Sequence, residues 1–532
     1  MEHYPSLTET VLALRNGQVT SEDTVKSSLD RIEELNDTLG AFIHVDREVA
    51  MKWAREADEQ LAEAASDPSA QAELPALLGV PTALKDGHEV AGMPTTFGTL
   101  INQDEDGEFP IAADSDPLAQ TLEAAGAVMV GKTQVPEFLL NCYSENRIFP
   151  PARNPHSPEH SPGGSSGGQA AAVASGMLAG AIGSDGGGSV RIPAAACGLI
   201  GLKPNRGRVL SSDALNNVGQ LGVNGPITRT ALDAALLMDV LSSTPGHTAI
   251  NRPVKAVPER SFTSVVSRAL AGDAPWGDRP LRIGVSTASP FEGTYDISVS
   301  PEAELALSEG VRQLQALGHE VEEAQINYLP GYAENFFKLW TTAVGQIPLA
   351  DGQELQLTGL ARHFREAALN RSAVELADAV SAIRVFEADT IAQYAQYDMI
   401  LTPALAMPPR PIDWYFEGYD MADPRSAERD YERQCQYTPY TSFINVVGLP
   451  AITVPTVWTQ PESGDYPGKV PMGVQLVGAA SSEAWLLSLA AQLNPPTDRG
   501  PRECNRTEHC VASLTSAGFP SRFGVWRTVR AP

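Results

Sequence analysis

The sequence predicts an α/β fold, because short apolar segments alternate with alanine-rich stretches that are typical of helices. Of the 532 residues, 42% are hydrophobic and 19% are charged, a balance that can fill a core and excludes a mainly disordered chain. The apolar segments are bounded by Gly and Pro, as buried strands are. They are 77–84, 127–130, 178–182, 283–285, 399–401, 451–454 and 473–477.

Composition divides the chain into three parts. Residues 1–76 predict an N-terminal helical region packing on the core, with a surface linker at 66–75. Residues 77–494 predict the main domain, which includes a helical, aromatic-rich segment at about 331–440. Residues 495–532 contain six Arg against three acidic residues and have no clear period, so we expect an irregular or disordered tail there.

The chain is strongly acidic, with 38 Lys and Arg against 65 Asp and Glu and a net charge of −27. This charge argues against a nucleic-acid partner and against binding to an anionic membrane surface. No stretch approaches the ~18 uninterrupted apolar residues of a membrane span. Five cysteines without a CxxC pair disfavour a disulfide framework or a thiolate metal site. We therefore expect a cytoplasmic protein.

Two glycine-rich loops, each carrying serine, are the most specific feature of the sequence. They are 163–168, Gly-Gly-Ser-Ser-Gly-Gly, and 185–189, Asp-Gly-Gly-Gly-Ser. The stretch 169–178 favours a helix and 179–184 favours a strand, so the chain leads away from the first loop and returns at the second. Ser165 and Ser189 are therefore expected to meet in space.

Loops of this kind suit acyl-transfer chemistry. Consecutive glycines let backbone N–H groups converge, and beside a serine hydroxyl such groups form an oxyanion hole. Tight turns or a phosphate cradle explain the two loops about equally well.

A serine nucleophile also needs a base. Lys85 is the best candidate, because burial would lower its pKa, although a solvated strand-end lysine is the alternative. His156 and His160 stand four residues apart, but prolines break any helix that would align them.

A second glycine motif is misleading. The segment 126–133 matches the phosphate-binding pattern GxxxxGK[ST]. Its variable positions are apolar and favour a strand, and Pro136 follows too soon for an uninterrupted helix. We therefore predict a helix over 117–125 and a strand over 127–130, without a nucleotide site. Cys197 lies in an apolar setting and is predicted to belong to the core rather than to act as a nucleophile.

The block 161–204 resembles the defining segment of the amidase signature family. It reads GGSSGGQAAAVASG followed by GSDGGGSVRIPAAACGLIGLKP. Further resemblance is carried by GVPTALKD, GAVMVGKTQVPEF, LTPALA and FINVVGLPAITVP. The resemblance covers roughly residues 6–492. It implies a single large domain in which a mixed, twisted β-sheet is covered by helices on both faces.

The resemblance also implies roles for individual residues. By position, Ser189 corresponds to the nucleophile, Ser165 to a bridging serine on a cis peptide bond, and Lys85 to the base. Gly186 departs from the family pattern, since many members carry a larger residue there. The resemblance also implies an oxyanion hole formed by Gly186, Gly187 and Gly188 together with the N–H of Ser189. Supporting roles fall to Ser166, Asp185 and Arg191. Leu139 would line the substrate pocket.

The implied activity is hydrolysis of a carboxylic amide C–N bond through an acyl-enzyme, without a metal or cofactor. Small-molecule amides, esters or carbamates would be substrates, and a monomer or homodimer is expected. Two alternatives are an amidotransferase A-subunit, which needs a partner to use ammonia from glutamine, and a catalytically inactive binding protein. Aromatic residues at 332–340 and 414–416 predict an aryl or apolar substrate if they line a funnel rather than the core.

Overall fold

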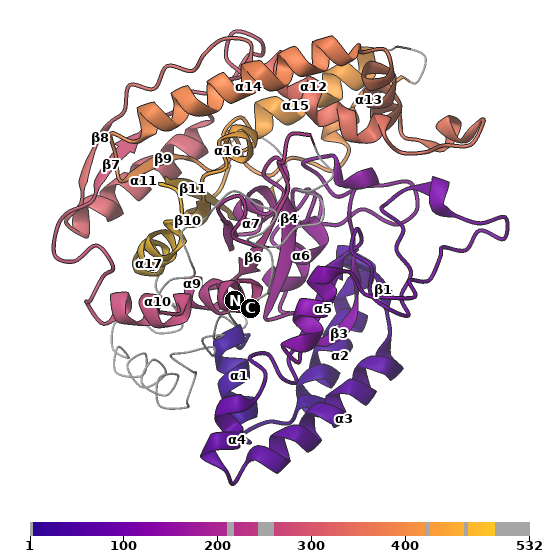
Figure 1. Cartoon of the computed structure of the whole chain (residues 1–532), viewed down its shortest axis with the longest axis vertical. Coiled ribbons are helices and arrows are strands. Elements are labelled where there is room, and N and C mark those ends of the chain that lie inside the picture. Colours follow the sequence, from indigo (N-terminus) through magenta and orange to yellow (C-terminus); the bar gives the residue numbers. More distant parts are fainter. Residues whose placement is uncertain are drawn as a thin grey trace, which may run out of the picture.

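The computed structural model describes residues 4–209, 218–242, 260–420, 423, 425–461 and 466–494 (Figure 1). The predicted tail at 495–532 lies outside the described residues. Within them the chain forms one large α/β domain around a single 11-stranded sheet, as predicted. Among the described helices, none has both the length and the apolar character that a bilayer crossing requires.

The sheet is mixed, with the strand order β1-β3-β2-β4-β6-β5-β10-β11-β9-β7-β8. β2 is parallel to both β3 and β4, whereas β4, β6, β5, β10, β11 and β9 pair antiparallel in that order. Each predicted apolar segment falls in or overlaps a strand. The strands are β1 Phe42–Val45, β2 Pro81–Lys85, β3 Val128–Thr133, β4 Gly180–Asp185, β5 Ile200–Lys203, β6 Val223–Thr228, β7 Arg282–Val285, β8 Glu320–Glu323, β9 Met399–Pro403, β10 Ala451–Thr459 and β11 Val470–Gly478.

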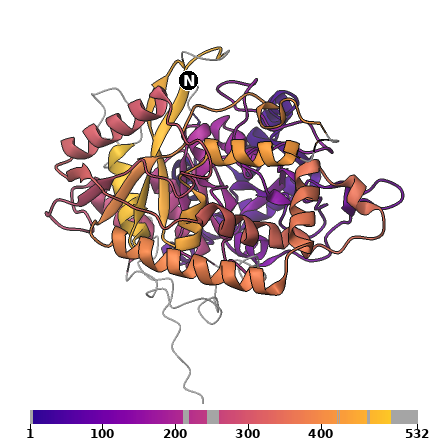
Figure 2. The same ribbon diagram turned by 90° about the horizontal axis from the view of Figure 1, so that it is seen from above.

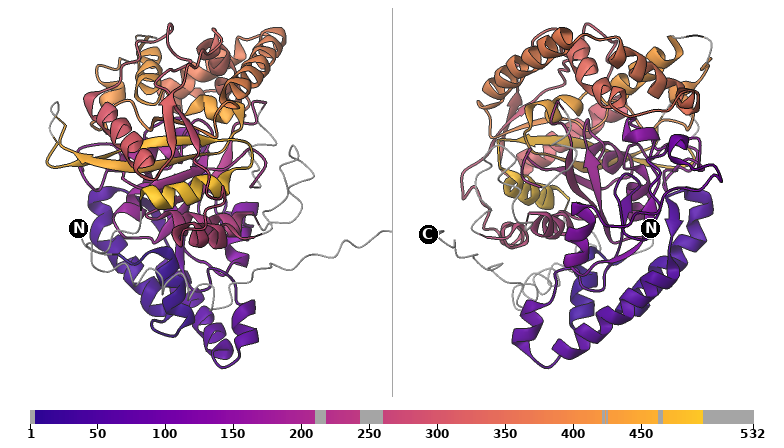
Figure 3. Two further views of the ribbon diagram at one scale, coloured as in Figure 1. Left: turned by 90° about the vertical axis from the view of Figure 1, so that its left-hand side faces the viewer. Right: turned by 45° about the vertical axis from the view of Figure 1, so that its right-hand side comes forward.

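Helices cover both faces of the sheet. On one face α1, α5, α9, α10 and α17 pack against the strands around Leu84 and Ile452. On the other face α2, α3 and α6 pack near β3 and β4, and α12, α14 and α16 pack near β9 and β11 (Figure 3). The described helices are α1 Leu7–Arg15, α2 Ser21–Leu39, α3 Arg47–Ala64, α4 Pro68–Glu73, α5 Pro117–Ala124, α6 Gly167–Ala174, α7 Arg191–Ala196, α9 Ala231–Leu241, α10 Phe262–Leu270, α11 Pro301–Ala316, α12 Tyr332–Gly345, α13 Gly359–Leu369, α14 Ala373–Tyr394, α15 Arg425–Tyr437, α16 Ser442–Val447 and α17 Glu483–Leu493.

The N-terminal region differs from its prediction in two ways. It is not wholly helical, because β1 joins the edge of the main sheet and pairs antiparallel with β3. In addition, the expected linker at 66–75 contains α4. The Asp67 side chain caps the N-terminus of this helix, and Pro68 is its first residue. The region is thus tied to the sheet by backbone hydrogen bonds as well as by helix packing.

The aromatic-rich segment forms an outer layer. Helices α12, α13, α14 and α15 lie together over one side of the molecule (Figures 1 and 2). Two single-turn 3₁₀ helices, η4 Gln353–Gln356 and η5 Trp414–Phe416, connect parts of this layer. The same segment also contributes β9 to the interior of the sheet, where all five of its residues are buried. It is therefore continuous with the core of the domain.

Candidate active site

The ends of two parallel neighbours, β2 and β4, bring the three candidate catalytic residues together. Lys85 is the last residue of β2, Ser165 lies just before α6, and Ser189 lies in the loop between β4 and α7. Lys85 Nζ lies 2.7 Å from Ser165 Oγ. Lys85 is fully buried, Ser165 is 1% exposed and Ser189 is 7% exposed. Helix α6 is the helix predicted after Ser165, and β4 is the strand predicted before Ser189.

The peptide bond between Gly164 and Ser165 is cis, as the resemblance implied. Ser165 and Ser189 line one cavity. Within the described residues, no hydrogen bond joins their two hydroxyls. Instead, the backbone N–H of Ser166 donates to the carbonyl oxygen of Ser189 at 3.3 Å, which holds the two loops against each other.

Ser184 contacts the buried lysine and was missed by the sequence analysis. Lys85 Nζ lies 2.8 Å from Ser184 Oγ and 3.4 Å from its carbonyl oxygen. Ser166 Oγ donates to that same carbonyl at 3.5 Å. Ser166 was expected to support Lys85 and Ser165. Its hydroxyl contacts Ser184, which in turn contacts Lys85. A serine directly before Asp185 at the end of a strand next to Lys85 is the signal that could have revealed this role.

Asp185 and Arg191 form a fully buried ion pair beneath the second glycine loop. Arg191 donates through Nε to Asp185 Oδ2 at 3.0 Å and through a terminal nitrogen to Oδ1 at 2.9 Å. Burial alone would raise the pKa of Asp185, but the charge and hydrogen bonds of Arg191 outweigh it and lower that pKa to about 2. Asn445 and Gln475, which the sequence did not single out, accept two further hydrogen bonds from Arg191 at 2.6 and 2.7 Å.

The same carboxylate organises the loop that precedes Ser189. The N–H of Gly188 donates to Asp185 Oδ1 at 2.8 Å, and the N–H of Val190 donates to Oδ2 at 3.2 Å. Gly188 has φ +129°, a conformation that L side chains rarely adopt. The N–H of Gly188 is therefore engaged with the Asp185 carboxylate. Gly186 and Gly187 instead lie against Trp340 and line the cavities beside Ser189.

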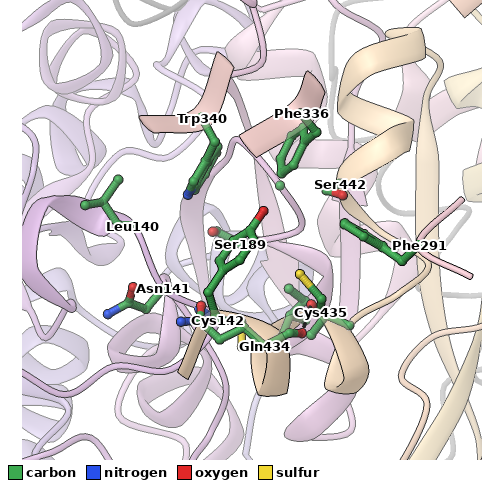
Figure 4. A pocket seen from close by; sticks show the side chains of 14 residues that line it. Leu140, Asn141, Cys142, Ser189, Phe291, Phe336, Trp340, Gln434, Cys435 and Ser442 are labelled. Atoms are coloured by element: carbon green, nitrogen blue, oxygen red, sulfur yellow. Dashed lines mark hydrogen bonds between the residues drawn. The ribbon is translucent and has the colours of Figure 1, made fainter. Parts of the chain in front are cut away.

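Two hollows flank Ser189 and share it as a lining residue. The larger, which we call the main cavity, has a volume of about 510 Å³ and is lined by Ser165, Ser184, Ser189 and Leu139, among others. The smaller, which we call the inner chamber, has a volume of about 50 Å³. Figure 4 shows Ser189 at its centre, with Trp340 and Phe336 on one side and Cys142 and Cys435 on the other. Leu139, which the resemblance assigned to the substrate pocket, lies on the wall of the main cavity.

The predicted aromatic funnel is only half formed. Phe336 and Trp340 line the inner chamber, and Trp340 lines the main cavity as well. Phe337, on the same helix, instead packs its ring against Phe364 and Tyr431. The cluster at 414–416 packs around Tyr143 and Tyr437, outside both hollows. Helical spacing explains the split, because positions 336 and 340 share a face and 337 turns away from it.

The misleading glycine motif is a strand, as predicted. Lys132 lies in β3, fully buried, with its Nζ 3.3 Å from the Asp86 carboxylate. It also donates to the hydroxyl of Thr95 at 2.8 Å. Cys197 is 1% exposed, and burial raises the pKa of its thiol, which fits a core residue. In the described part of the chain, no group of three His, Cys, Asp or Glu side chains is placed to hold a metal ion.

Comparison with known proteins agrees with this architecture. The sequence model of the Amidase family matches residues 23–487. AmiA2 of Mycobacterium tuberculosis, an amidase by name, is 35% identical over 92% of this chain and 93% of its own length. The A-subunit of the glutamyl-tRNA(Gln) amidotransferase of Chromohalobacter salexigens is 29% identical over 93% of this chain and 97% of its own.

A solved structure of similar shape is 6-aminohexanoate cyclic dimer hydrolase in complex with its substrate. It has a TM-score of 0.76 and 26% identity, covering 93% of this chain and 98% of that one. Family match, relatives and fold agree over nearly the whole described chain. This chain therefore belongs to the amidase signature family and is a hydrolase that acts on amide C–N bonds.

Proposed function

We propose that this hydrolase works through an acyl-enzyme, with Ser189 as the nucleophile, Ser165 as the bridging hydroxyl and Lys85 as the base. The observation that carries the proposal is the buried 2.7 Å contact between Lys85 Nζ and Ser165 Oγ at a cavity that Ser189 also lines. A lysine amine can replace histidine as the base of a serine hydrolase when it is neutral. Both hydroxyls then lie between this amine and the substrate.

The proton route follows from these contacts. Ser189 Oγ attacks the acyl carbon while its proton passes to Ser165, and the Ser165 proton passes to the neutral amine of Lys85. The C–N bond then breaks, the same relay returns a proton to the leaving amine, and the acyl group stays on Ser189. Water, activated by the relay in turn, hydrolyses the ester and releases the carboxylic acid.

Ser184 serves as a positioning residue in this proposal. A neutral lysine has two N–H groups and one lone pair. In the proposed neutral form, the N–H groups would donate to Ser184 Oγ and to its carbonyl oxygen, at 2.8 and 3.4 Å, and the lone pair would accept from the Ser165 hydroxyl at 2.7 Å. Ser166 fixes the same carbonyl and therefore supports this arrangement indirectly.

The oxyanion of the tetrahedral intermediate would be bound by backbone N–H groups of Gly186, Gly187 and Ser189. These residues line the cavities beside the nucleophile, whereas the N–H of Gly188 is occupied by Asp185. Removing one donor from such a site costs about 3–4 kcal/mol in transition-state stabilisation in a measured case. The buried pair of Asp185 and Arg191 holds the loop in place.

We further propose amides with an aryl or extended apolar group as preferred substrates, with esters and carbamates accepted as well. Trp340, Phe336 and Leu139 supply apolar walls next to Ser189. Esters and carbamates pass through the same kind of acyl-enzyme. A cytoplasmic location as a monomer or homodimer fits the low number of cysteines, of which the three in the described residues are unpaired, and the net charge of −27.

An amidotransferase A-subunit is the alternative, and the relative of that name is 29% identical to this chain. The two functions differ in a simple measurement. A self-sufficient hydrolase cleaves anilides as the purified chain alone, whereas an A-subunit shows glutaminase activity only with its partner protein. Apolar walls beside Ser189 favour the first function, because glutamine offers little surface to match them.

The decisive experiment is to trap the acyl-enzyme. A p-nitrophenyl ester is mixed with the purified protein, quenched in acid, and the digest is analysed by mass spectrometry. We expect the acyl group on the peptide that contains Ser189 and no adduct in Ser189→Ala. An adduct on Cys142 or Cys435, which also line the inner chamber, would overturn the assignment.

A further inference from the structure

A separate cavity of about 610 Å³ lies behind the wall of the inner chamber, and we call it the acidic cavity. The wall is the segment 140–143. Leu140 and Cys142 line the inner chamber, Tyr143 lines the acidic cavity, and Asn141 lines both. The acidic cavity contains three carboxylates, from Glu145, Asp413 and Asp430, and none of them takes part in the proposed reaction.

Two buried acceptors at this cavity lack a donor. Glu145 Oε1 and Asn141 Oδ1 are buried and have no hydrogen-bond partner among the described residues. Asn141 is only 7% exposed, and Figure 4 shows its amide directed away from Ser189. Buried polar atoms are nearly always hydrogen-bonded in native structures. These two acceptors therefore point to a ligand that donates hydrogen bonds.

The charge of the cavity indicates that the donor is a cation. Burial, together with the nearby charges of Asp413 and Asp430, raises the pKa of Glu145 to about 8, against the opposing effects of the Asp413 backbone N–H and of Arg153. Burial likewise raises the pKa of Asp430 to about 7. A bound cation would stabilise the ionised form of both carboxylates. Arg147, at the rim, donates to the carbonyl of Gln356 at 2.9 Å.

The remaining lining indicates an organic cation. Asp430 already accepts hydrogen bonds from Tyr143 at 3.0 Å and from Gln434 at 2.8 Å, so it supplies charge rather than a free acceptor. The rings of Tyr143, Phe416 and Tyr419 also line the cavity. Aromatic faces bind ammonium groups and the carbon skeletons that carry them.

We propose that the acidic cavity is a binding site for an organic primary ammonium ion. Its N–H groups would donate to Glu145, Asp413 and the side-chain oxygen of Asn141. Its apolar part would lie against the three rings. The site is independent of the reaction proposed at Ser189, so either proposal can fail without the other.

Titration calorimetry with phenethylammonium tests the site, with 2-phenylethanol as the neutral probe of matching shape. We expect saturable binding of one phenethylammonium per chain and binding at least tenfold weaker for the alcohol. Affinity should rise from pH 7 to pH 9, because Glu145 loses its proton in this range, while an alkylammonium comparable to the lysine side chain, with its pKa of about 10.4, stays mostly protonated. Equal binding of the two probes would overturn the proposal.

Variants locate the binding. Glu145→Gln keeps the shape and should weaken binding about tenfold. Asp413→Asn should weaken it several-fold and fold normally, because Asp413 has φ +71° and Asn tolerates that conformation. Glu417→Gln removes an equal charge from an exposed site outside the cavity and should change nothing. Unchanged binding in both cavity variants, or binding abolished by acylation of Ser189, would show that the ligand sits elsewhere.

Discussion

Two segments that contribute to the surroundings of Ser189 are held in place by different forces. In the glycine–serine block at 161–204, directional contacts dominate: Ser165 lies 2.7 Å from Lys85 of β2, and Asp185 meets Arg191 at 2.9 Å. In the helical segment at 331–440, Phe336 and Trp340 reach the same site through the packing of apolar helices. The proposed chemistry therefore depends on hydrogen-bond geometry, whereas the shape of the cavity depends on the packing of apolar side chains.

The largest effect is expected from the proposed triad. Ser189→Ala and Lys85→Ala should each lower kcat by about 10⁴-fold or more, because the loss of one member of such a catalytic unit also makes the other members ineffective. Steady-state hydrolysis of an anilide measures this, and circular dichroism checks the fold. The double variant should be no worse than the more damaging single one. Additive losses would show that the two residues do not act as a unit.

The buried ion pair should govern stability. Asp185→Asn leaves Arg191 buried without its counter-charge and should lower the free energy of unfolding by about 3–5 kcal/mol, measured by urea denaturation. The native pKa of Asp185 is about 2, below the ~3.9 of an unfolded chain. Its stabilisation is therefore complete above about pH 4 and is lost as the pH falls towards 2. Asp278→Asn, at an exposed site, is the control.

Ser184 tests the positioning of the lysine. Ser184→Ala removes one acceptor of Lys85 and should lower kcat by about 10–100-fold with little change in KM. Ser184→Thr keeps a hydroxyl and should restore most of the activity. A purely structural role predicts instead that kcat follows thermal stability across the two variants and that the pH profile of kcat stays unchanged.

The smallest effect belongs to the aromatic wall. Trp340→Leu should raise KM for an aryl anilide about tenfold and leave kcat for a small aliphatic amide nearly unchanged. Phe337→Leu is a matched control on the same helix, because its ring packs against Phe364 and Tyr431 rather than the cavity. Equal losses on both substrates would place Trp340 in the chemistry rather than in specificity.

Sequence patterns predicted the glycine–serine block better than the helical segment. The strand ending at Lys85, the helix after Ser165 and the strand before Ser189 follow from local periodicity. The aromatic residues at 414–416 were assigned to a possible funnel, but they pack around Tyr143 and Tyr437 instead. A cluster of aromatic residues looks the same in sequence whether it fills a core or lines a cavity. Only its position relative to other segments distinguishes the two.

The sequence by itself determined the α/β class, the seven main apolar strands and the candidate residues of the glycine loops, because these depend on local spacing and on glycine's freedom. The tertiary structure decided which long-range partners complete the site. Asn445 and Gln475 reach Arg191 from segments more than 250 positions away, and Ser184 meets Lys85 between the neighbouring strands β4 and β2. These contacts depend on how distant elements pack, and no local pattern in the chain records that packing.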